Sequence, residues 1–139
     1  MTYSDEQLRQ IYDRSSGYCH LCHKKLAFSN YGKPNSRAAW EVEHSNAQAN
    51  GGTNRLNNLF PACISCNRSK GVSSTKVARA KNGKSRAPLS LQKRKKAKVV
   101  NAFAGGAAFA VVGSVFGPAG FYLGALIGAN IGYQLNPDK

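Results

Sequence analysis

Four cysteines and an adjacent acid–histidine pair are the residues of this chain whose types and spacing could do chemistry. The cysteines form two C-x-x-C pairs, Cys19 with Cys22 and Cys63 with Cys66. Two such pairs can complete the tetrahedral thiolate shell of one zinc ion. Between them lie Glu43, which offers oxygen ligands, and His44, whose imidazole titrates close to neutral pH.

Zinc explains the cysteines better than disulfides do. The start of the chain, Met1 to Asp5, lacks the charged and apolar regions of a signal peptide, so we expect a reducing compartment. Four thiolates leave zinc no open position for water, which predicts a structural ion that contributes to folding. We therefore do not expect His20 and His23, which flank Cys22, to be zinc ligands.

The elements that must position these residues begin with a helix and a strand. Residues 4–16 predict a helix, with a capping box between Ser4 and Gln7. Residues 38–44 predict a strand that points Trp40 and Val42 toward the core and the two glutamates toward the other face.

A turn, a second strand and a second helix should follow. The run from Asn50 to Asn54 contains two glycines and predicts a turn. We expect an extended segment at residues 58–60, ended by Pro61, and a helix beginning at Asn67. The predicted order around His44 is therefore strand, turn, strand, helix.

These residues together resemble the HNH endonucleases, which have a ββα-metal core. The resemblance covers roughly residues 7–71 and rests on five motifs, Glu43-His44, Gly51-Gly52-Thr53-Asn54, Asn58-Leu59, Cys63-x-x-Cys66-Asn67-x-x-Lys70-Gly71 and the earlier Cys19-x-x-Cys22 of the zinc-stapled branch. This chain has Glu43 where the family usually has aspartate, and Asn67 where it often has histidine. Both changes keep an oxygen ligand. The resemblance implies an α+β fold and an H-N-N variant of the site.

The resemblance also implies a role for each residue in phosphodiester hydrolysis. His44 would be the general base that activates water, and Glu43 and Asn67 would hold one Mg²⁺ or Mn²⁺ ion. Asn58 would bind the backbone of the loop that carries His44. Asn57 competes with Asn58 for that role.

The charge distribution predicts a polyanionic partner, which we expect to be double-stranded DNA. The net charge is +14, and no acidic residue occurs between Glu43 and Asp138. The expected phosphate contacts are Arg68, Lys70, Lys76 and Arg79. Lys70 could instead be a solvated helix end.

Composition divides the chain into a nuclease domain at 1–75, a basic linker at 76–98 and an apolar tail at 99–139. The linker predicts a helix, a flexible joint and a second helix starting near Ser90. The tail is uncharged up to Pro137, and its glycines recur every four residues as in a glycine zipper. It predicts a helical hairpin, with arms at 99–116 and 120–135.

The tail could enter a lipid bilayer or pair copies of the chain into a homo-oligomer. The lysines before residue 99 favour a bacterial inner membrane with the nuclease facing the cytoplasm. Such a nuclease would suit defence against incoming phage or plasmid DNA. One alternative is a secreted antibacterial DNase toxin whose tail crosses a target membrane. Another is a zinc-ribbon DNA-binding module without catalysis.

Overall fold

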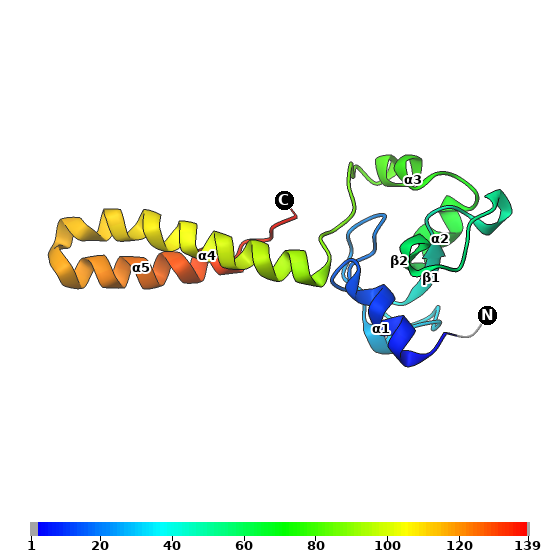
Figure 1. Ribbon diagram of the computed structural model, residues 1–139, viewed down its shortest axis with the longest axis horizontal. Coiled ribbons are helices and arrows are strands. Elements are labelled where there is room, and N and C mark those ends of the chain that lie inside the picture. Colours follow the sequence, from blue (N-terminus) through cyan, green and yellow to red (C-terminus); the bar gives the residue numbers. More distant parts are fainter. Residues whose placement is uncertain (1–2, 139) are drawn as a thin grey trace. The chain divides into compact units, whose positions relative to one another are not determined.

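The computed structural model describes residues 3–138, which form two compact units (Figure 1). One unit ends at Leu91 and the other begins at Gln92. The first unit contains a two-stranded sheet and three short helices, and the second contains a pair of long helices. The fold is therefore α+β over the cysteine and acid–histidine motifs, followed by a helical hairpin.

Helix α1 (Asp5–Asp13) begins at the predicted cap. The Ser4 hydroxyl accepts from the Gln7 backbone over 3.2 Å, and the Gln7 side chain accepts from the Ser4 backbone over 3.0 Å. The capping box is thus confirmed. The helix ends before residue 16 because the chain turns at Gly17, whose φ is +70° and whose N–H donates to the carbonyl of Tyr12.

The sheet pairs β1 (Trp40–His44) with β2 (Leu59–Cys63) in antiparallel register. The expectation that Pro61 ends the second strand is wrong, because β2 continues through Pro61, which lies opposite Val42. Both strands of a two-stranded sheet are edges, where a residue without an N–H is tolerated. The carbonyl of Pro61 accepts from the backbone of His20 over 3.0 Å.

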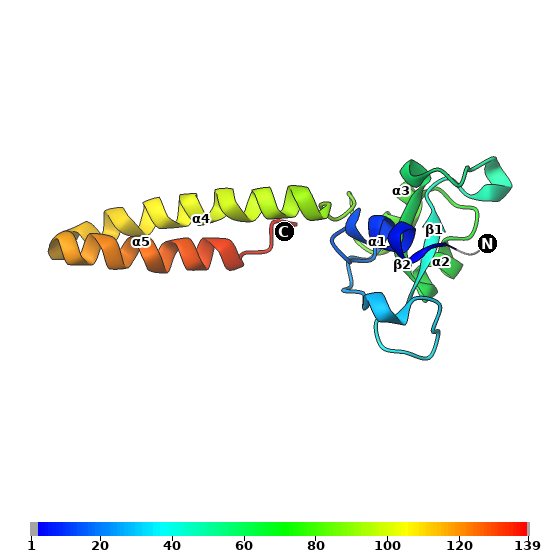
Figure 2. The same cartoon turned by 60° about the horizontal axis from the view of Figure 1, so that its bottom comes forward.

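Two short helices follow the sheet (Figure 2). Helix α2 (Ile64–Lys70) starts three residues before the predicted Asn67, since Cys63 already serves as its N-cap residue. Helix α3 (Thr75–Lys81) is capped by Ser74, whose hydroxyl accepts from Val77. The predicted order of strand, turn, strand and helix is confirmed.

The core of the first unit is built around Trp40. Its side chain is fully buried and its indole N–H donates to the carbonyl of Phe28 over 3.2 Å. The rings of Tyr12 and Tyr31 lie 5.4 and 5.0 Å from it. Aliphatic residues from α1, the first cysteine turn and β2 complete this core, namely Leu8, Ile11, Leu21, Leu59 and Ala62.

The second unit is the helical hairpin that the sequence predicts. Helix α4 (Leu91–Gly113) continues without interruption from the lysine-rich segment into the apolar arm. A single 3-10 turn (Ser114–Phe116) joins it to α5 (Gly117–Gln134), where Gly117 has φ +81°.

Glycines let the two arms approach backbone to backbone. A Cβ on Gly128 would collide with the carbonyl of Gly105, and one on Gly113 would collide with the carbonyl of Gly120. The large side chains point outward instead, with Phe103, Val115 and Phe116 at least 77% exposed. The glycine face is therefore filled within the hairpin itself.

Candidate active site

The four cysteines converge on one point. Their sulfur atoms all lie within 4.8 Å of one another, with Sγ of Cys63 3.5 Å from that of Cys22 and 3.6 Å from that of Cys19. Sulfurs bound 2.3 Å from one tetrahedral zinc ion would be about 3.8 Å apart. Hydrogen bonds from the thiols of Cys19 and Cys22 lower the pKa of Cys63. The cluster is therefore consistent with a structural zinc ion.

Two turns bring these thiols together. In the first turn the backbone of Cys19 donates to the carbonyl of Lys24 over 2.8 Å, and His23 adopts φ +65°. In the second, Cys63 caps α2 and Cys66 lies in its first turn. Neither neighbouring histidine belongs to the cluster, because His20 contacts Glu43 and His23 lies 2.9 Å from the carbonyl of Arg86.

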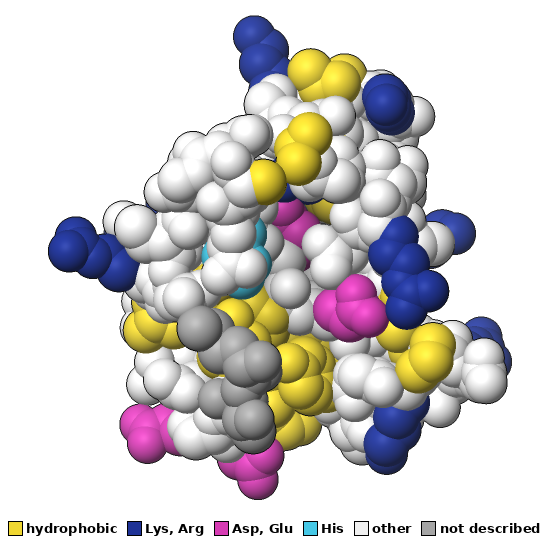
Figure 3. All heavy atoms as spheres, turned by 90° about the vertical axis from the view of Figure 1, so that its right-hand side faces the viewer, with side chains coloured by type: hydrophobic (Ala, Val, Ile, Leu, Met, Phe, Trp, Pro, Cys, Tyr) yellow, Lys and Arg dark blue, Asp and Glu magenta, His cyan; other side chains and the backbone are white. Residues whose placement is uncertain are grey.

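Glu43, His44 and Asn67 line one cavity of about 180 Å³, formed by the end of β1, the following loop and α2. Figure 3 shows one face of the first unit with a hollow near its centre, where histidine and acidic side chains are visible, and with Lys and Arg mostly toward its outer edge. The cavity brings the three residues to one place, but each polar group has a different partner.

Glu43 is 1% exposed and lies beneath α2 rather than on an open face of the strand. Its Oε1 is 2.7 Å from Nζ of Lys70, and its Oε2 contacts Nε2 of His20. Burial alone would raise the pKa of Glu43, but these two partners outweigh burial and lower it. The carboxylate is thus a buried anion.

Lys70 joins this carboxylate to the backbone of His44. Its side chain is 1% exposed, and its ammonium also donates to the carbonyl of His44 over 3.0 Å. The solvated-helix-end interpretation is therefore wrong. Because Lys70 also lines the cavity, a phosphate contact stays a prediction.

The imidazole of His44 has one nitrogen fixed by the turn. Its Nε2 lies 2.8 Å from Oδ1 of Asn54, which also accepts from Gln48 over 3.0 Å. Since this oxygen only accepts, Nε2 of His44 donates to it, and in the neutral imidazole the lone pair is then on Nδ1. Sequence reasoning placed Asn54 in a turn but missed this side-chain role.

Asn58 closes the loop that follows His44. Its Oδ1 accepts from the backbone of Asn46 over 2.7 Å, while its Nδ2 donates to the carbonyls of Asn46 and Thr53. Asn57 instead accepts a hydrogen bond from the Arg14 side chain with its backbone carbonyl, over 3.3 Å. Asn58 thus binds the backbone around His44.

Asn67 has a partner that sequence reasoning did not assign to the site. Its Nδ2 donates to Oε2 of Glu41 over 3.0 Å, and Arg68 lies 3.7 Å from the other oxygen of Glu41. Alternation along β1 puts Glu41 on the same side as Glu43, which was the available signal.

The donor chemistry of the cavity fits an oxygen-preferring divalent cation. A carboxylate offers about four lone-pair positions, so Glu43 retains some after its two contacts. No described residue donates to Oδ1 of Asn67, which lines the same cavity. Carboxylate and amide oxygens are the ligands that Mg²⁺ and Mn²⁺ favour.

The four predicted phosphate contacts occupy different environments. The side chain of Arg68 is 69% exposed, and Lys76 is also exposed. Arg79 is half-buried and donates to His20 through both Nε and Nη2, over 2.9 and 3.1 Å. Burial lowers the pKa of Arg79. Its guanidinium is thus committed to a contact inside the protein.

Comparison with known proteins identifies one part of the chain. Residues 19–73 match the family described as HNH endonuclease. Searches of curated proteins and of solved structures gave no significant match. The matched residues include both cysteine pairs and every residue that lines the cavity of Glu43 and His44.

Proposed function

Residues 19–73 match the HNH endonuclease family, and on this premise we propose that the protein is a divalent-metal-dependent endonuclease that hydrolyses DNA phosphodiester bonds. The observation that carries the proposal is the setting of His44. Its Nε2 is fixed by Asn54, and Glu43 and Asn67, whose side chains carry oxygen donors, line the same cavity.

His44 would act as the general base, because Nδ1 can take a proton from a water molecule. Asn54 keeps the imidazole in this tautomer, and Asn58 holds the loop behind it. Glu43 and Asn67 would hold Mg²⁺ or Mn²⁺, which when bound would neutralise charge at the scissile phosphate and the leaving oxygen. Arg68 and Lys76, which are exposed, would contact the DNA backbone.

A plasmid-cleavage assay with His44→Ala tests this proposal. Loss of a general base typically costs about 10²- to 10⁴-fold in rate, so we expect cleavage to fall by at least about 100-fold. The zinc content and thermal unfolding of the variant should match the wild type. Cleavage should also stop when Mg²⁺ is withdrawn.

The same assay separates catalysis from simple DNA binding. Wild-type protein that shifts DNA without cutting it, at any Mg²⁺ or Mn²⁺ concentration, would favour a zinc-ribbon binding module. Equal cleavage by wild type and His44→Ala would contradict the assignment of His44.

We propose that the hairpin holds the nuclease at a membrane. The segment Leu91–Gln134, which folds into the two arms α4 and α5, includes a window with a mean hydropathy of 1.8, as apolar as a membrane-spanning stretch. Its exposed surface at the tip carries Val111, Val112, Val115 and Phe116, at 66–81% exposure. Water-exposed apolar area of this extent is typical of a membrane or protein contact.

Polarity changes along the hairpin in the direction that tip-first insertion requires. The base carries lysines at 93, 95, 96 and 98, whereas residues 99–137 carry no charge. Near the tip the hydroxyl of Ser114 donates to the carbonyl of Val111 over 2.7 Å. This hydroxyl would therefore keep its hydrogen bond inside the bilayer, where no water is present to replace it. Basic residues at the base favour a cytoplasmic nuclease.

An oligomer is the second candidate for the same surface. The glycine face cannot serve it, because that face already joins the two arms of one chain. Association between copies would have to use the outer side chains. The filled glycine face therefore supports the bilayer over the oligomer.

Flotation with vesicles distinguishes these outcomes. We expect the full-length protein to float with vesicles that contain anionic phosphatidylglycerol, and to float less when Val115 and Phe116 are both changed to Asp. A full-length protein that stays soluble and monomeric in the presence of vesicles would contradict the membrane proposal. A soluble oligomer would favour self-assembly.

A membrane-held nuclease facing the cytoplasm would meet phage or plasmid DNA as it enters the cell, which suits a defence role. Cells that express the wild-type protein should then take up plasmid or support phage less efficiently than cells that express His44→Ala. The alternative is a secreted antibacterial toxin, which would instead kill neighbouring cells that lack a neutralising partner.

A further inference from the structure

A buried chain of polar side chains lies behind Glu43, the carboxylate proposed to hold metal. His20 is fully buried, and its Nε2 contacts Oε2 of Glu43. Arg79 of α3 donates from Nη2 to Nδ1 of His20 over 3.1 Å, and from Nε to the His20 carbonyl over 2.9 Å. The chain thus connects α3, the first cysteine turn and β1.

The contact with Arg79 determines which nitrogen of His20 carries the proton. A guanidinium donates hydrogen bonds and does not accept them, so Nδ1 of His20 must be the acceptor. The imidazole is therefore neutral, with its N–H at Nε2 facing Glu43. The ring stacks on Phe60 at 4.8 Å with a 10° angle between planes, which leaves it one orientation.

The carboxylate of Glu43 is held equally firmly from its other side. Lys70 contacts Oε1 at 2.7 Å and also donates to the carbonyl of His44. The two oxygens of Glu43 therefore have separate partners, and one of these partners also fixes the peptide of His44. Small displacements of either partner would move the carboxylate within the cavity.

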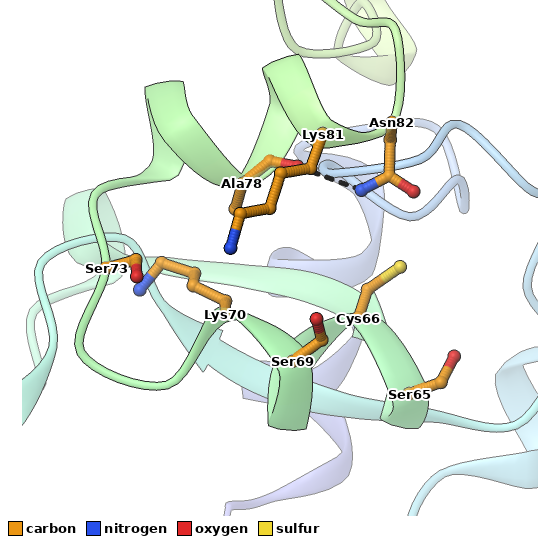
Figure 4. A pocket seen from close by; sticks show the side chains of 8 residues that line it. All are labelled: Ser65, Cys66, Ser69, Lys70, Ser73, Ala78, Lys81 and Asn82. Carbon is orange, nitrogen blue, oxygen red and sulfur yellow. Dashed lines mark hydrogen bonds between the residues drawn. The ribbon is translucent and has the colours of Figure 1, made fainter.

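Arg79 has a role beyond the packing of its helix. Helix α3 faces α2 across a second cavity of about 200 Å³, whose lining includes Ala78 and Lys81 (Figure 4). Ala78 is buried and belongs to the core, whereas Arg79 points away from that cavity toward His20. Removal of the Arg79 guanidinium therefore leaves the packing contact of Ala78 in place.

We propose that His20 and Arg79 are positioning residues for the metal-holding carboxylate of Glu43. Arg79 sets the tautomer of His20, and His20 sets the orientation of the carboxylate. The inference rests on the proposed nuclease function. It extends the nuclease site beyond residue 73, where the family match ends, into α3.

Mn²⁺ binding to the zinc-loaded full-length protein, measured by electron paramagnetic resonance without DNA, tests this role. Groups that orient a metal ligand typically contribute about 10- to 100-fold in metal affinity. We expect Arg79→Ala and His20→Leu to weaken Mn²⁺ binding by at least about tenfold. His20→Gln keeps an N–H donor, and Arg79→Lys keeps one cationic donor, so both should bind Mn²⁺ more tightly than the first two variants.

Lys81→Ala is the matched control, since it removes one positive charge from an exposed position of α3. A merely electrostatic effect of Arg79 would appear equally in this variant. DNA affinity of the zinc-loaded protein, measured without added Mg²⁺ or Mn²⁺, should also fall by the same small factor in Arg79→Ala and Lys81→Ala.

Three results would overturn the proposal. One is Mn²⁺ affinity in folded Arg79→Ala and His20→Leu that equals the affinity of Lys81→Ala. Another applies if those two variants unfold. It is a loss of Mn²⁺ affinity in the folded His20→Gln and Arg79→Lys variants as large as the loss of at least about tenfold expected of Arg79→Ala and His20→Leu. The third is wild-type protein that neither binds Mn²⁺ nor cleaves DNA, which would remove the proposed function as well.

Discussion

The two units of this molecule bury opposite kinds of side chain. In the first unit the fully buried residues are large, among them Trp40, Ile11 and Leu21. In the hairpin the buried residues are small, such as Gly128, Gly132 and Ala110, apart from Arg94 at the base, while the large side chain of Phe103 faces outward. The first unit thus buries its large apolar side chains, and the hairpin exposes them.

The difference lies in what stabilises each unit. Burial of apolar area drives the first unit to fold, and a zinc ion held by the cysteine cluster would add metal-linked stabilisation. Backbone packing at glycines holds the hairpin together, and this interaction does not depend on water. Apolar side chains are therefore placed in opposite ways in the two units, inside the first and on the outside of the second.

The largest expected effect is the loss of one cysteine. Cys63→Ser should unfold the first unit, because metal binding contributes on the order of 10 kcal/mol, comparable with the whole stability of a small domain. Zinc content by elemental analysis should fall, while the helical circular dichroism of the hairpin persists. Ser69→Ala, an exposed change on the same helix, is the control. Concerted loss of both units would contradict their independence.

A bulky residue in the glycine face should disturb only the hairpin. Leu at Gly128 would collide with the backbone of Gly105, so we expect destabilisation of about 1–3 kcal/mol or separation of the arms. Thermal unfolding of the hairpin in lipid vesicles measures the change. Ala104→Leu adds a similar volume on the exposed face and should have little effect. A loss of zinc in Gly128→Leu would contradict the expectation that this change disturbs only the hairpin.

The smallest expected effect concerns the cap of α1. Ser4→Ala removes the acceptor for the Gln7 backbone and should cost about 1 kcal/mol. This corresponds to a fall of roughly 4–8 °C in the melting temperature of a unit of this size, with no change in the hairpin. Ser4→Thr should restore most of the loss, and identical melting of Ser4→Ala and wild type would contradict the capping role.

Local signals predicted the elements better than their ends. The capping box of Ser4, the strand at Trp40 and the glycine-rich turn each depend on a few neighbouring residues. Helix α2 begins earlier than predicted because Cys63 is both a member of the cysteine cluster and the N-cap residue of the helix. Hydrophobic periodicity does not reveal this double role. Pro61 stays in the strand because its missing N–H is not needed at a sheet edge.

The sequence motifs grouped residues that line one cavity, but they did not predict the contacts of these residues. Motif spacing brought Glu43, His44 and Asn67 to one cavity. The partners of Glu43 are distant in sequence, since His20 precedes it by 23 positions and Lys70 follows it by 27. Contacts between buried residues this far apart in sequence can be seen only in the folded chain.

The segment between α3 and α4 has a consequence for how a tethered nuclease would find DNA. The carbonyl of Arg86 lies 2.9 Å from Nε2 of His23, and the carbonyl of Leu89 accepts from Ser16 over 2.8 Å. Few residues therefore remain to form a flexible linker before α4 begins at Leu91. With its hairpin anchored, such an enzyme would sample only DNA passing close to its anchor, so its rate would follow the local concentration of DNA there rather than the average in the cell.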